Sequence, residues 1–257
     1  MKVRNGWQKL LDENKKITFN QGENKMAQAQ AVQTGTVSEP RVLRFMAQIY
    51  LLMSVGLLIT ALVSTWVSTN PRLLLRLNTS PGLAFGLFII QIVIVIALSA
   101  KIMDMNTGAA ALLFFFYAAL TGLTISFIFL IYTSEQISSV FWITAGTFFI
   151  TSLVGFILKI DLAKTGGILF MLLCGWSLAW LFSIIFSPAS NFNWTLNFIG
   201  IALFVGLTAW DTAALKKMGQ QLDTHPARGG LIVLGALKLY LDFINLFLLL
   251  LRASSRR

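Results

Sequence analysis

Two aspartates lie inside long apolar stretches of this sequence, where ionisable side chains are unusual. Asp242 is in the middle of the last stretch, with Lys238 four residues before it, and Asp211 lies near the end of the preceding stretch. If these stretches cross a bilayer, an ionised side chain within them costs at least about 2.5–3.5 kcal/mol. Each aspartate therefore needs a partner, a water-filled cavity or a function.

The chemistry of such a pair depends on whether the two carboxyl groups meet. Close together in a low dielectric, Asp211 and Asp242 cannot both ionise cheaply, so they would share a proton. The pair would be a pH-dependent latch between two helices, or a cation site when deprotonated, because carboxylate and carbonyl oxygens suit Ca²⁺. The alternative is structural: Lys238 shares a helix face with Asp242 and would pair with it, while Asp211 would bond to Thr208 or to backbone. Spacing alone does not separate the two.

The composition indicates what positions these residues. Of the 257 residues, 56% are hydrophobic and 12% are charged, whereas soluble domains carry about 25% charged residues. The apolar residues form runs of about 20, the length that a helix needs to cross a bilayer. We therefore predict an all-α polytopic membrane protein. Its net charge of +10 is better explained by membrane topology than by nucleic-acid binding.

Seven apolar runs divide the chain into spans joined by short connections. We predict a polar, disordered cytoplasmic tail over 1–40 and one seven-helix transmembrane domain over 41–257. The predicted spans are about 45–67, 83–103, 108–132, 138–159, 166–187, 194–216 and 232–252.

The distribution of basic residues predicts the orientation. Most lysines and arginines fall in the tail and in the connections on the same side, which places the N-terminus in the cytoplasm and the C-terminus outside. Trp66, Trp142 and Trp194 all fall at the opposite interface, where tryptophan is favoured.

The depth of the two aspartates follows from the helical rise. Asp211 precedes Lys216 by five residues, which is about 7–8 Å along a helix. If the last span enters the membrane near Lys238, with its ammonium group at the interface, Asp242 lies about 6 Å deep. We therefore expect Asp211 and Asp242 at one level near the cytoplasmic side.

Three segments that carry these residues resemble one family. Ala236–Phe247 (ALKLYLDFINLF) is very similar to the last-span signature of the Bax inhibitor (transmembrane Bax inhibitor motif) family. Gly206–Lys216 resembles its sixth-span motif, with Trp210 where tyrosine is usual, and Phe115–Ser126 resembles its third span. The resemblance covers about residues 40–252 and is to a bacterial-type member.

The resemblance implies a seven-helix bundle with the last helix central. Bacterial members are similar to pH-sensitive calcium leak channels of the inner membrane, and their aspartate pair matches Asp211 and Asp242. A basic residue that engages the pair in some members has Lys101 as its nearest counterpart, and Lys238 is a second possible partner. Gln91 stands where some members carry an acidic residue. We expect calcium as permeant or bound ion and no other cofactor.

Other functions remain open beside the channel. Family members include inhibitors of cell death and modulators of a membrane protease, so the alternative is a non-transporting regulator that binds other membrane proteins in the bilayer. An intramembrane aspartyl protease is disfavoured because Leu239-Tyr-Leu-Asp242 replaces the Gly-x-Gly-Asp motif. A retinal receptor is disfavoured by the predicted orientation and by Lys238, which precedes its acid by one turn. We therefore expect no enzymatic activity.

Overall fold

The computed structural model describes residues 39–102, 104–158, 161–186, 190–221 and 228–255, and within these ranges it is helical with no strand. The predicted tail over 1–40 lies outside the described residues, except for the two residues that open the first long helix.

Seven long helices confirm the seven predicted spans, and each is long and apolar enough to cross a membrane. Helices α5 and α6 together form one span, because the short α6 continues α5. The helices are α2 (Glu39–Ser68), α4 (Pro81–Lys101), α5 (Thr107–Ile125) with α6 (Ile128–Ile131), α7 (Ser134–Ile157), α8 (Leu162–Phe186), α9 (Ser190–Gln221) and α10 (Arg228–Ser254).

Local sequence signals set where the helices begin. Asn106 caps α5, its side-chain oxygen accepting from the Gly108 amide at 2.8 Å. Thr133 and Gln136 form a reciprocal capping box at the start of α7, which satisfies amides that have no partner within the helix. One short helix, α3 (Pro71–Thr79), was not predicted. It lies between α2 and α4 and, like α4, begins at a proline, a residue suited to the first helical position.

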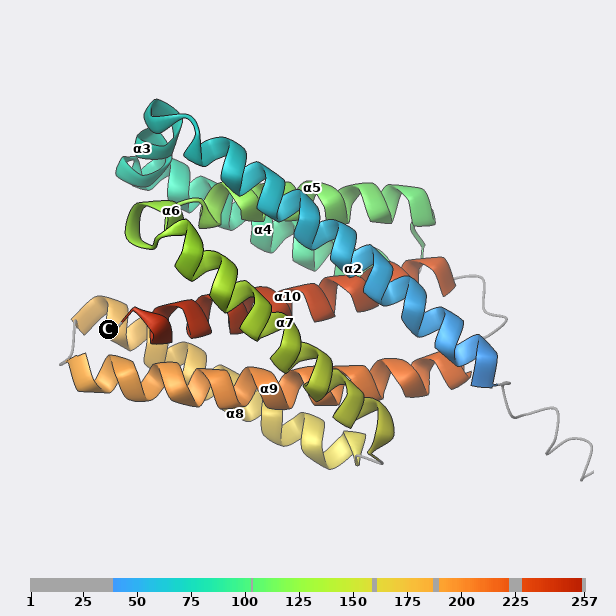
Figure 1. Cartoon of the computed structure of the whole chain (residues 1–257). Coiled ribbons are helices and arrows are strands. Elements are labelled where there is room, and N and C mark those ends of the chain that lie inside the picture. The colour runs from blue at the N-terminus through green and yellow to red at the C-terminus, as the bar shows by residue number, and fades with distance from the viewer. Residues whose placement is uncertain (1–38, 103, 159–160, 187–189, 222–227, 256–257) are drawn as a thin grey trace, which may run out of the picture.

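Helix α10 is the centre of the bundle, as the family resemblance implied. In Figure 1 it runs through the middle of the molecule, and it packs against α2, α5, α7 and α9. In the most apolar stretch of α10, 67% of the residues are buried inside the protein, whereas in that of α8 none are. Tyr240, one of its fully buried side chains, meets the Phe114 ring edge-on at 5.6 Å between centroids. The helix that carries Asp242 is therefore the one least exposed to lipid.

Two helices are peripheral. Helix α4 packs mainly on α5 and α8 mainly on α9, and both leave large apolar side chains exposed, among them Phe85 and Phe170. Such surfaces suit a hydrocarbon environment rather than water.

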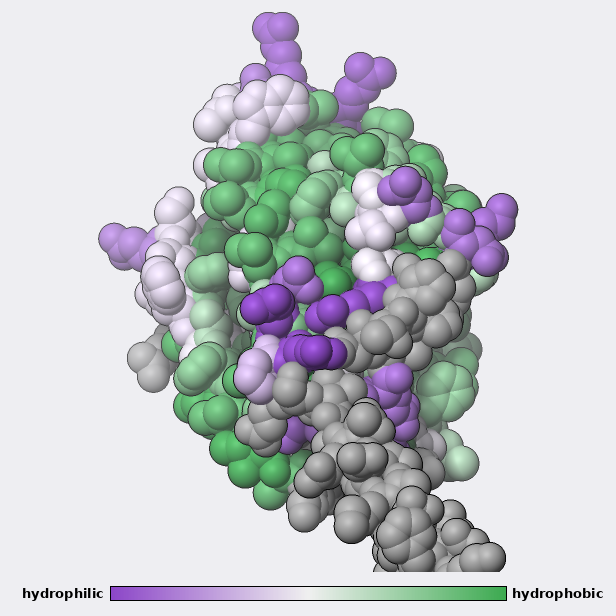
Figure 2. Space-filling model, turned by 90° about the vertical axis from the view of Figure 1, so that its right-hand side faces the viewer, coloured by the Kyte–Doolittle hydropathy of each residue, from purple (hydrophilic) through white to green (hydrophobic). Residues whose placement is uncertain are grey.

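The two ends of the bundle differ in charge. One end, here called the basic end, gathers hydrophilic side chains over the helix termini (Figure 2). Its described basic residues are Arg41, Arg44, Lys101, Lys164, Lys216, Lys217 and Arg228. The opposite end holds the α2–α4 connection, the start of α7 and the end of α10. This asymmetry agrees with a cytoplasmic basic end, and the orientation itself stays a prediction.

Glycine permits the closest helix crossings. At the crossing of α7 and α9, a Cβ on Gly155 would overlap the carbonyl oxygen of Ala209. At the crossing of α2 and α5, a Cβ on Gly122 would lie 2.7 Å from the Thr60 carbonyl oxygen. Small residues let membrane helices approach to backbone contact, so these two pairs of helices are held by their main chains.

We expect Gly155→Ala to destabilise the protein by about 1–3 kcal/mol, because the added methyl group overpacks a backbone contact. Gly146→Ala, on the same helix, is the matched control: its Cβ would meet nothing within 4 Å, and alanine has the higher helix propensity. Thermal unfolding in detergent measures both. Equal melting temperatures for the two variants would contradict the crossing.

We expect a cysteine at Ser255, at the opposite end, to be labelled from outside spheroplasts by a membrane-impermeant maleimide. The background is Cys174→Ser, which removes the single native thiol. A cysteine at Gln220, exposed at the basic end, is the control and should react only after lysis. The reverse pattern would show that the predicted orientation is wrong.

Candidate functional site

Asp211 and Asp242 lie on two antiparallel helices that pack along their length. Asp211 precedes the end of α9 at Gln221 by ten residues, and Lys238 follows the start of α10 at Arg228 by ten residues. The antiparallel arrangement therefore places Asp211 level with Lys238. Asp242 lies about one turn, or about 6 Å, further along α10.

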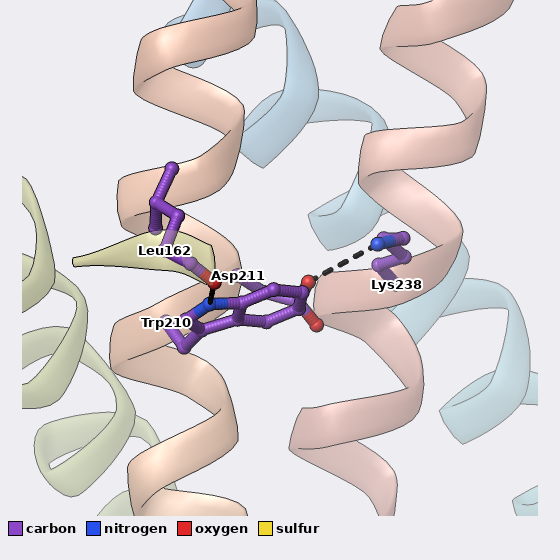
Figure 3. Close-up of polar contacts among 4 residues, drawn as sticks. All are labelled: Leu162, Trp210, Asp211 and Lys238. Atoms are coloured by element: carbon purple, nitrogen blue, oxygen red, sulfur yellow. Dashed lines mark hydrogen bonds and ion pairs between the residues drawn. The ribbon is translucent and has the colours of Figure 1, made fainter. Parts of the chain in front are cut away.

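Lys238 joins the two helices. Its Nζ donates to Oδ1 of Asp211 at 3.2 Å (Figure 3), and the side chains are 41% and 10% exposed. The ion pair therefore links α10 to α9. The structural alternative had instead predicted a pair between Lys238 and Asp242 on the same helix. One end of the pair reaches the surface while the carboxylate end is enclosed.

Asp242 is buried beside this ion pair. Only 6% of the residue is exposed, and its carboxyl group lies within electrostatic reach of the Asp211 carboxyl group and the Lys238 ammonium group. Its Oδ2 atom has no hydrogen-bond partner among the described residues. Two carboxylates are acceptors only, so a hydrogen bond between Asp211 and Asp242 requires a proton on one of them.

The position of Asp242 along α10 differs from the position expected from the sequence. Helix α10 runs unbroken from Arg228, and residues before Lys238, such as Val233 and Leu237, are already buried in the core. The apolar course of the helix therefore does not start at Lys238. Asp211 and Asp242 therefore differ in level by about one turn, or about 6 Å, instead of lying at one level as expected.

Trp210 holds α8 against the site. Its indole Nε1 donates to the Leu162 carbonyl oxygen at 3.1 Å (Figure 3), and its ring fills the space above Gly166. The Lys238 ammonium lies 5.6 Å from its ring centroid, within the range of a cation–π contact. The sequence marked Trp210 only as the residue that stands where tyrosine is usual in the family. Its position next to Asp211 was the only signal of its contact with the lysine.

The other residues singled out from the sequence lie elsewhere. Lys101 is exposed at the end of α4, and no ion pair with either aspartate is found within the described residues. Gln91 donates to the hydroxyl groups of Thr121 and Thr124 at 3.1 and 3.3 Å. It therefore fastens α4 to α5 and does not contact the aspartate pair.

The site offers few ligands for a resident metal ion. The described part of the chain contains no group of three or more His, Cys, Asp or Glu side chains placed to hold a metal. Calcium takes six to eight oxygen ligands, and Lys238 adds a positive charge beside the two carboxyl groups. Two carboxyl groups alone supply fewer oxygen ligands than calcium takes when tightly held.

Comparison with known proteins agrees with the motifs. The model of the family "Inhibitor of apoptosis-promoting Bax1" matches residues 42–256. The inner membrane protein YbhL of Escherichia coli (strain K12) is 45% identical over 215 residues, which are 83% of this chain and 92% of that protein. An uncharacterised protein of Borreliella burgdorferi is 39% identical over the same shares. Another, from Rickettsia prowazekii, is 36% identical over 83% of this chain and 90% of its own.

We expect Asp211 and Lys238 to be energetically coupled. In a double-mutant cycle of Asp211→Asn and Lys238→Met, contacting residues typically give coupling energies of about 0.5–3 kcal/mol. Reversible denaturation in mixed micelles measures it. The control cycle pairs Asp211→Asn with Lys217→Met, because Lys217 is exposed at the same end. The effects of these two substitutions on stability should add within about 0.5 kcal/mol. Equal coupling in both cycles would contradict a specific ion pair.

Proposed function

Because this chain belongs to the Bax inhibitor family of integral membrane proteins, we propose that it is a pH-sensitive calcium leak channel of the bacterial inner membrane. The observation that carries the proposal is the buried Asp211–Asp242 pair between α9 and the central helix α10. The name of the E. coli relative, an inner membrane protein, supports the proposed compartment.

The gate follows from the charges of three side chains. With one proton shared between the aspartates, Asp211, Asp242 and Lys238 together are neutral, and the shared proton ties α9 to α10. Loss of that proton leaves two carboxylates against one ammonium group. The like charges then repel in a low dielectric, and the net negative charge attracts a cation. Rising pH therefore opens the gate, and falling pH closes it.

Polar side chains continue along α9 beyond the pair. Thr208 is fully buried one turn from Asp211. Further along, Asn197 is buried too, its Nδ2 donating to the Leu249 carbonyl oxygen at 3.0 Å, while its Oδ1 has no partner among the described residues. Carboxylate, hydroxyl and amide oxygens are the groups that replace water around a hard cation. They support calcium as the permeant ion.

We expect purified protein in calcium-loaded liposomes to leak calcium faster as pH is raised from mildly acidic to mildly alkaline. Asp242→Asn and Asp211→Asn should each abolish this pH dependence, because an amide cannot lose the shared proton. Asp104→Asn, an exposed acid outside the pair, is the control and should keep the wild-type profile. Flux that both pair variants leave unchanged would refute the proposal.

No catalytic reaction is proposed for the pair. An aspartyl protease needs both carboxyl groups to act on one water molecule, whereas Lys238 engages Asp211 directly. Turnover of a membrane substrate that is lost on either Asp→Ala change would overturn this part of the proposal.

The second candidate is a non-transporting regulator that binds other membrane proteins, such as a membrane protease. The observation that favours it is the peripheral helix α8, which packs mainly on α9 and leaves its apolar side chains exposed. The same Asp→Asn variants discriminate the two candidates. A full physiological effect in cells with calcium flux abolished would favour the regulator.

A further inference from the structure

A cavity lies at the end of the bundle opposite the basic end. It has a volume of about 270 Å³ and lies between α2, the α5–α6 segment, α7 and α10. Its deepest wall is formed by Phe243, Ile244 and Phe247 of the central helix, which are 3%, 8% and 5% exposed. No residue of the proton-sharing pair lines it.

The cavity exists because two helices diverge over the central one. Helices α2 and α7 cross over α10 (Figure 1), and each packs on α10. On α7, Phe141 reaches down to Phe243 and Phe247, with ring centroids 5.6 and 6.4 Å apart. Where the two helices part, their facing side chains are small and exposed: Ala61 and Thr65 on α2, Ser138 on α7. These residues are too small to close the gap, so they form a mouth.

The chemistry of the cavity selects an apolar occupant. None of the described residues that line it carries a charge. The buried hydroxyl groups in its wall already donate to backbone carbonyls, Thr60 to Ala118 and Ser64 to Ala61, so they offer no free donor to a polar ligand. Smaller apolar cavities, of about 150 Å³, stay dry and bind benzene or xenon. Water is therefore not the expected filling.

The position of the mouth identifies the source of an apolar occupant. Ala61 and Thr65 lie on the exposed face of α2, two turns or less before the helix ends at Ser68. This part of α2 belongs to its membrane-spanning stretch. The mouth therefore opens sideways toward the hydrocarbon near the interface, where phospholipid acyl chains are the neighbouring molecules. Exposed hydroxyl groups of Thr65 and Ser138 at the rim can donate to an ester carbonyl.

We propose that this cavity is a binding site for one acyl chain of a phospholipid from the leaflet at the opposite end. The chain enters between α2 and α7 and lies against Phe243, Ile244 and Phe247, with its ester group at the rim. The site does not depend on ion conduction, since none of its residues belongs to the aspartate pair.

Photocrosslinking tests the site directly. The full-length protein is placed in nanodiscs with phosphatidylcholine that carries a diazirine in its acyl chain, irradiated, and mapped by peptide mass spectrometry. We expect labels on Phe243, Ile244 or Phe247, because lipid that only surrounds the protein cannot reach these buried residues. Labels on exposed residues of α8, such as Phe170 and Met171, are the internal reference. Labelling of α8 without any on α10 would overturn the proposal.

Closing the mouth gives a second, independent result. Ala61→Phe and Ser138→Phe, on different helices, should each lower the α10 labels about tenfold relative to α8. Ser54→Phe is the matched control, because Ser54 is exposed on the same face of α2 seven residues earlier, outside the cavity, and should leave the ratio unchanged. An unchanged ratio in both mouth variants, with a monodisperse elution profile, would overturn the site.

Discussion

A carboxyl group buried inside a membrane protein cannot form hydrogen bonds with bulk water, and this constraint applies to Asp242 on the most buried helix of the molecule. Asp242 sits on α10, where lipid contact is least and where Oδ2 finds no donor among the described residues. An unpaired charge there is expensive, so its state depends on the two ionisable groups within reach. The ionised Asp211 and Lys238 have opposite charges that cancel. The site is therefore neutral when Asp242 is protonated and negative when Asp242 is ionised. A change of charge at this site would therefore act on the helix that contacts α2, α5, α7 and α9.

Different helices contribute different parts of the site around Asp242. Helix α9 presents Asp211 and packs closely on α7 and α8, while α10 presents Lys238 and Asp242 to it. Trp210 ties the start of α8 to the same level through the Leu162 carbonyl. Helices α4 and α8 complete the surface toward lipid. The acyl-chain cavity lies on the other side of α10, where Phe243 directly follows Asp242 in the sequence, so one helix is in contact with both sites.

The sequence predicts the parts of this structure that the bilayer itself dictates. Hydrocarbon thickness fixes the length of an apolar run, so all seven spans were predictable, whereas the nine-residue α3 is too short and too polar to give that signal. The sequence predicts that Asp211 and Asp242 each need a partner, because ionised groups in apolar runs are costly, and the structure buries both. The actual partner of Lys238 was not predictable, since spacing shows which residues share a face but not how the next helix is rotated. Lys101 was named as a partner from the family resemblance, and in the structure it lies exposed at the end of α4.

The glycine contacts give the bundle an uneven stiffness. Where α7 crosses α9 at Gly155 and α2 crosses α5 at Gly122, main chain meets main chain or the root of a side chain, and no rotamer change can open or shift the contact. Helix α10 is fixed in this way only near its start, where Gly230 lies against the Ile102 carbonyl oxygen. Beyond Lys238 it is held by rings and aliphatic side chains, and by side-chain hydrogen bonds from Asn197 and Thr60, all of which can rearrange. Side-chain rearrangement can therefore move α10 beyond Lys238 more easily than it can move the two glycine crossings.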